Sequence, residues 1–189
     1  MGKSFKEIGI IQRENSKISM ALAIGVFITI VIGWVTASIQ RVSYGSYLQP
    51  DKVIETIFII PTMLFLLLVH EGIHVLFFLM YGKGKAKIEV KLERSVGAII
   101  MHQVNPEVYY QRNEMLVILL APLVIITGGL LMLDQIVMLP FLFMTNILLN
   151  SIGSSVDLYL SYQLLFRYKS QHFINFDTKE PILYIHQKI

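Results

Sequence analysis

Two histidines and a glutamate stand inside one of the most apolar stretches of this chain. Residues 70–74 read His-Glu-Gly-Ile-His, and most of the other residues of 53–80 are apolar. If this stretch is a helix, positions four residues apart lie about 40° apart on one face, so His70 and His74 can bind the same metal ion. Glu71 can then act as a general base on a zinc-bound water. The spacing therefore indicates the chemistry of a zinc hydrolase.

The composition places this motif in an integral membrane protein. Hydrophobic residues make up 54% of the 189 residues, charged residues 15%, and the mean hydropathy is +0.62. Imidazoles and carboxylates are costly at membrane depth unless a partner compensates them, and a metal ion is such a partner. The alternative is a proton relay or a structural pair of histidines. The chain has no cysteine, so a metal must be held by His, Asp, Glu or Asn side chains.

Four segments are long and apolar enough to be membrane spans. They cover about 18–39, 53–81, 115–133 and 136–166. The last is longer than one span needs and contains the polar stretch 150–155, so we expect a broken helix that lines a cavity. The predicted fold class is an all-α integral membrane protein of about four transmembrane helices, forming a single membrane domain over 1–189.

The segment between the second and third spans has a different pattern. Charged and apolar residues alternate strictly over 85–93, which predicts a strand, and 96–101 can form the return strand. We expect a small β-hairpin at about 85–101. Its edge could take up an extended substrate segment, or the hairpin could simply anchor the insert at the membrane surface.

The basic residues indicate an orientation. Fourteen of the sixteen lysines and arginines lie in the N-terminal segment, the 82–114 insert and the tail 167–189. Only Arg41 and Lys52 fall on the other side of the four predicted spans. By the positive-inside rule, both termini and the insert should be cytoplasmic.

Asp157 is the best candidate for a third metal ligand. It is the only acidic residue in 136–166, whereas the remaining candidates are expected in surface loops or tails: His102, Glu114, Asp134, His172 and His186. An unpaired aspartate at that depth would be costly, and a metal shared with the two histidines resolves the cost. The alternative is a hydrogen bond from Asp157 to a neighbouring serine or tyrosine.

Asn150 and Ser154 precede Asp157 on roughly the same helical face and are predicted to line the same cavity as substrate-binding residues. Asn150 could donate a hydrogen bond to a substrate carbonyl or to the developing oxyanion. Ser154 could also support Asp157. The alternative for Asn150 is a hydrogen bond that only holds two helices together.

Together these residues resemble the site-2 protease class of intramembrane zinc metalloproteases. The resemblance rests on the motif at 70–74, the strand-containing insert, Ala121-Pro122 early in the next span, and Asn150 with Asp157 in the last. It covers about 53–166 and is closest to a compact bacterial family described as putative zincin peptidases. The arrangement departs from the Asn-Pro and Asp-Gly pairs typical of the class, because Ser151 follows Asn150 and Leu158 follows Asp157.

The resemblance implies that His70, His74 and Asp157 hold Zn²⁺ and that Glu71 is the general base. It also implies hydrolysis of peptide bonds in a membrane protein or peptide, within the lipid bilayer of a bacterial cell membrane, and no nucleic-acid partner. The alternatives are a membrane metal-binding or transport component, or a catalytically inactive regulator with the same triad. A transporter would usually carry several polar clusters along a path, whereas this chain has one.

Overall fold

The computed structural model describes residues 5–11, 23–24, 26–27, 30–31, 53–93, 98–137, 139–176 and 183–188. The first predicted span, 18–39, lies almost entirely outside these residues, and its six described residues are helical.

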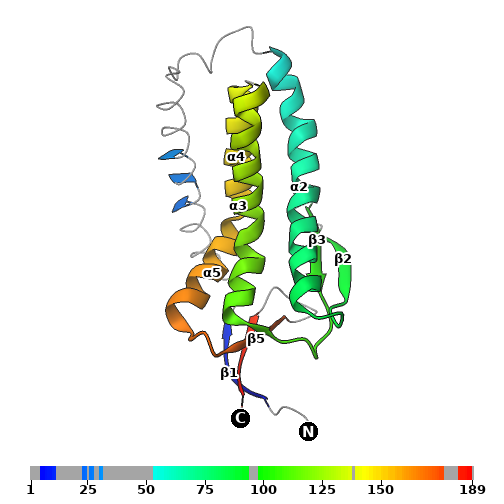
Figure 1. Ribbon diagram of the computed structural model, residues 1–189, viewed down its shortest axis with the longest axis vertical. Coiled ribbons are helices and arrows are strands. Elements are labelled where there is room, and N and C mark those ends of the chain that lie inside the picture. The colour runs from blue at the N-terminus through cyan, green and yellow to red at the C-terminus, as the bar shows by residue number, and fades with distance from the viewer. Residues whose placement is uncertain are drawn as a thin grey trace.

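Four helices dominate the described part of the chain. They are α2 (Val53–Tyr81), α3 (Arg112–Val137), α4 (Pro140–Gly153) and α5 (Ser155–Arg167). Figure 1 shows α2, α3 and α4 running together along the long axis, with α5 bent away at the lower end of α4. Among the described residues, α2 and α3 are long and apolar enough to cross a membrane, and α4 with α5 makes a third span if the bent pair is counted as one.

The predicted break in the last span is confirmed. The axes of α4 and α5 differ by 52°, and the break falls at Ser154. The backbone N–H of Ser154 still donates to the Asn150 carbonyl at 2.9 Å, so the chain completes the last turn of α4 before it changes direction. The bend sets Asp157 in the first turn of a new helix.

The three long helices share a buried apolar cluster. It contains residues from the inner faces of α2, α3 and α4: Ile73, Ala121, Ile126, Leu130, Phe143 and Ile147. Close packing of this kind does not need water to drive it, so it can also hold helices together in lipid. The cluster fixes α2 against α4, and the polar motif of α2 lies at its edge.

The predicted hairpin is confirmed. Strands β2 (Ile88–Glu93) and β3 (Ala98–Gln103) pair antiparallel, with Ile88 opposite Gln103 and Glu93 opposite Ala98. The hairpin lies beside the lower half of α2 (Figure 1).

A second sheet was not predicted. Its strands are β1 (Phe5–Ile11), β6 (Leu183–Lys188), β5 (Phe173–Phe176) and β4 (Tyr110–Gln111), in that spatial order and all antiparallel. The prediction of an all-α fold with one hairpin is therefore corrected to a mostly helical fold with a small sheet. The tail 167–189 contributes two of the strands.

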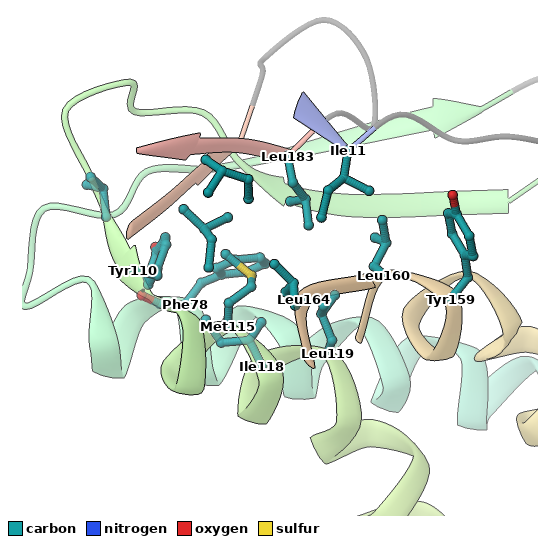
Figure 2. Packing of buried hydrophobic residues seen from close by; sticks show 13 residues of the cluster. Ile11, Phe78, Tyr110, Met115, Ile118, Leu119, Tyr159, Leu160, Leu164 and Leu183 are labelled. Atoms are coloured by element: carbon teal, nitrogen blue, oxygen red, sulfur yellow. Dashed lines mark hydrogen bonds between the residues drawn. The ribbon is translucent and has the colours of Figure 1, made fainter. Parts of the chain in front are cut away.

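This sheet is joined to the helices by the larger of the two apolar cores. Figure 2 shows Ile11 and Leu183 reaching from the strands toward Leu160 and Leu164 of α5, with Met115 of α3 below them. Leu164 and Leu183 are fully buried. Strands β1 and β6 thus form part of the core on which α5 packs, and α5 is the helix that carries Asp157.

Candidate metal centre

Helix α2 places His70 and His74 one turn apart on its buried face. Each histidine is 8% exposed, and their Nε2 atoms are 3.2 Å apart. Glu71 is only half-buried, but its charge is close enough to act on His74. The helix therefore turns both imidazoles into the bundle and leaves the carboxylate nearer its surface.

Helix α5 brings Asp157 to the same point. Its Oδ2 atom lies 3.3 Å from Nε2 of His70 and 3.5 Å from Nε2 of His74. The three residues form the group of potential metal ligands found in the described part of the chain, with their donor atoms all within 4.8 Å of one another. Residues more than 80 positions apart in sequence thus converge on one buried point.

The donor set fits zinc. A tetrahedral zinc ion lies about 2.0–2.1 Å from each nitrogen or oxygen ligand, which puts ligand atoms about 3.3 Å from one another. The three observed separations, 3.2, 3.3 and 3.5 Å, match the edges of such a tetrahedron. Two imidazoles and one carboxylate are also a common set for a catalytic zinc, which keeps its fourth position for water or substrate.

Each histidine is held from behind by a carbonyl oxygen. Nδ1 of His74 is 2.9 Å from the backbone oxygen of Ile118, and Nδ1 of His70 is 3.2 Å from Oδ1 of Asn150. The Ile118 oxygen can only accept, so Nδ1 of His74 donates to it, and the placement of Oδ1 of Asn150 assigns the same tautomer to His70. Both Nε2 atoms then present lone pairs to the shared point, as metal-binding histidines do.

Asn150 lies beside the triad and makes a contact to His70 that was not predicted. It is buried, and its Oδ1 atom accepts from His70 while Nδ2 has no hydrogen-bond partner among the described residues. Ser154 is fully buried at the break between α4 and α5, and its hydroxyl makes no hydrogen bond to Asp157 or to another described residue. A substrate contact by either residue stays a prediction.

Sequence reasoning missed the Ile118 carbonyl, because a backbone oxygen has no residue-type signature. A signal was nevertheless present. Pro122 follows four residues later, and a proline inside a helix leaves the carbonyl four residues before it without a backbone donor.

The surface location predicted for Asp134 is wrong. Helix α3 continues to Val137, beyond the expected end of the span at 133, and Asp134 falls on its buried face one turn after Leu130. It is 1% exposed. At the same end of the bundle Glu55 is also buried, and its Oε2 atom accepts from the backbone N–H of Leu142 at 3.0 Å, near the start of α4. Neither acid belongs to the ligand group.

Three other candidate ligands, Glu114, His172 and His186, lie near the four-stranded sheet. Glu114 accepts from the backbone N–H of Gln111 at 2.7 Å, at the start of α3. Burial and the nearby cations Lys169 and Arg112 lower the pKa of His172, which keeps its Nδ1 an acceptor for the Lys169 N–H at 3.1 Å. Burial also lowers the pKa of His186 on β6. The side chain of His102 lies outside the described part of the structure.

Comparison with known proteins gives one match. Residues 63–173, more than half of the chain, match the model of a family described as "Putative zincin peptidase". The matched region contains the motif at 70–74, Asn150 and Asp157. No curated protein and no solved structure gives a significant match.

Proposed function

The chain belongs to the putative zincin peptidase family, and from this premise we propose that it is a zinc metallopeptidase that hydrolyses peptide bonds of membrane-associated substrates. The observation that carries the proposal is the convergence of His70, His74 and Asp157 within 4.8 Å. Two of these residues come from α2 and one from α5, so the fold brings polar groups from separate elements to one buried point.

The residues around this point suit peptide hydrolysis. Zinc held there would act as a Lewis acid and make a water molecule nucleophilic near neutral pH. Glu71 accepts the proton of the attacking water and returns it to the leaving amine. Nδ2 of Asn150 is free to donate to the substrate carbonyl oxygen as negative charge develops on it, and the Ser154 hydroxyl offers a further polar contact.

We place the reaction inside a membrane. His70 lies eleven residues before the end of α2 at Tyr81, about 16 Å along the axis, which is close to the middle of a bilayer about 30 Å thick. Large apolar side chains are exposed along the outer faces of α2 and α3, among them Phe65, Leu68 and Val124. Such surfaces suit lipid and would be unfavourable in water.

The test separates metal binding from proton transfer. Glu71→Gln keeps all three ligands and removes the base, so it should bind zinc like the wild type and lose cleavage. His70→Ala should lose both. Zinc content is measured on the purified proteins, and cleavage is read by comparing the membrane proteomes of cells that express each variant.

Each outcome tests a different part of the proposal. Cleavage that survives Glu71→Gln would refute the assigned base, and full zinc occupancy after His70→Ala would refute the ligand set. Normal zinc binding with identical proteomes for the wild type and Glu71→Gln would favour a metal-binding or regulatory role in place of a peptidase.

A further inference from the structure

Pro122 lies inside α3, where a proline is normally unfavourable. It is fully buried among the residues of the helix bundle. In an α-helix the N–H of each residue donates to the carbonyl four residues earlier, and proline has no N–H to donate. The carbonyl of Ile118 therefore has no backbone partner from residue 122.

That carbonyl is the one that holds His74. Nδ1 of His74 donates to the Ile118 oxygen at 2.9 Å, across the contact between α2 and α3. Ile118 is itself fully buried, so water does not compete for this oxygen. A residue with an N–H at position 122 would supply a donor from within α3 and compete with the imidazole.

We propose that Pro122 is a positioning residue of the metal centre. Because it supplies no helical N–H to the Ile118 carbonyl, it reserves that oxygen for His74 and fixes the tautomer in which Nε2 faces His70 and Asp157. The inference rests on the metal site of the proposed function, but not on peptide hydrolysis.

The chain contains a matched control. Pro61 lies inside α2 in the same way, and it frees the carbonyl of Ile57. Pro61 is exposed on the outside of its helix, and Ile57 makes no contact with the triad among the interactions of the described residues. Replacing Pro61 restores a helical N–H without changing the bond to His74.

The experiment measures zinc affinity of the purified full-length protein by competition with a chromophoric chelator, and the unfolding temperature of the metal-free protein. Pro122→Ala should weaken zinc binding about tenfold. This is at the low end of what is lost when the partner of a metal ligand is removed, because a carbonyl oxygen has two lone pairs and keeps part of its bond to His74. The unfolding temperature should stay the same or rise, since alanine favours the helix.

Three further variants exclude a general effect of altered packing. Pro61→Ala should bind zinc like the wild type, and so should Ile126→Val, which opens a small cavity on the buried face of α3 without a new N–H. Pro122→Gly carries the same new N–H as Pro122→Ala and should lose affinity in the same way.

Wild-type affinity in Pro122→Ala would overturn the inference, as would an equal loss in Pro61→Ala or Ile126→Val. If the wild type itself bound no zinc, the proposed function would fail together with this inference. If zinc binding depends on Pro122 but the protein cleaves nothing, the role of Pro122 stands and the peptidase activity is refuted.

Discussion

At the scale of single residues, the two ends of the Asn150 amide have different surroundings. Oδ1 holds the His70 ring, and the buried Nδ2 has no hydrogen-bond partner among the described residues. An aspartate in its place keeps an oxygen that accepts from Nδ1 but loses the donor, whereas an alanine loses both. The contact to His70 and the proposed donation to the substrate can therefore be separated by substitution.

Asn150→Ala is expected to lower zinc affinity about 10- to 100-fold, as is usual when an outer partner of a ligand is removed. Asn150→Asp should bind zinc nearly as well as the wild type. Both should lower the cleavage rate by about 10²–10³-fold, because neither can donate to the developing oxyanion. Chelator competition measures the first effect and a cleavage assay the second.

Asn146→Ala is the control for this pair. Asn146 is a buried asparagine one turn earlier on α4, and its Nδ2 donates to the Leu142 carbonyl at 2.9 Å. Its loss should leave zinc affinity unchanged. Equal affinities for Asn150→Ala and Asn150→Asp would contradict the division of tasks.

The sequence predicted the residues of the triad because their polarity conflicts with their surroundings. His70, His74 and Asp157 are unexplained in apolar helices, and one metal ion explains all three. Asp134 was predicted wrongly because it lies near the end of α3, where the length of the helix decides whether a residue is in a loop or in the core. Helix ends are the least reliable part of a prediction from pattern. The role of the Ile118 carbonyl could have been found only by noticing that Pro122 lacks the N–H that would normally bond to it.

At the scale of elements, the sheet and α3 together support α5 through one apolar core. Buried residues of β1 and β6 pack on Leu160 and Leu164, and Tyr159 in the same core lies two residues after Asp157. Helices α4 and α5 meet at the bend at Ser154, and α5 also packs against α3 through this core. The direction of α5 therefore depends on the sheet as well as on the bend.

Two adjacent isoleucines of β1 test this dependence. Ile11 is 5% exposed in the core, whereas Ile10 is 45% exposed on the other face of the strand. Ile11→Ala should lower the free energy of unfolding by about 2–5 kcal/mol, because it leaves a cavity in a packed core. Denaturant or thermal unfolding in detergent measures the change.

Ile10→Ala removes the same atoms from an exposed position and should change stability by less than about 0.5 kcal/mol. A similar loss in both variants would mean that β1 contributes through its strand propensity and not through the core under α5.

The four-stranded sheet could not be predicted because its pairing is long-range. Strand β1 pairs with β6 from the far end of the chain, and β4 has only two residues. The hairpin at β2 and β3 was predictable because its two strands are neighbours in sequence and its first strand alternates clearly. Helix α2 was predicted at its observed bounds, since a long apolar run is the strongest local signal.

At the scale of the whole molecule, the distribution of charge predicts the orientation that the protein would take in a membrane. The sheet and the hairpin both lie toward the end of the bundle that holds the two chain termini in Figure 1. Fourteen of the sixteen lysines and arginines lie in the N-terminal segment, the 82–114 insert and the tail 167–189, which contain these strands, and we expect this end to face the cytoplasm. The opposite end carries the turn between α3 and α4.

The absence of cysteine from the sequence makes the orientation straightforward to test. Lys85→Cys, Lys188→Cys and Ile136→Cys each place one thiol at an exposed position. A membrane-impermeant maleimide added to intact cells should label only the variant at 136, and all three should react after the membrane is opened. Labelling at 85 or 188 in intact cells would show that the orientation is reversed.

The pairing of β1 with β6 also bears on how the protein is made. Phe5–Ile11 leaves the ribosome early, but the strand beside it is completed only when Leu183–Lys188 has been synthesised. Until then the core under α5 lacks the side chains of β6, among them the fully buried Leu183 and Ile185. A nascent chain would thus carry all three residues of the triad before the core that supports α5 is complete, so the final stability of the site depends on β6.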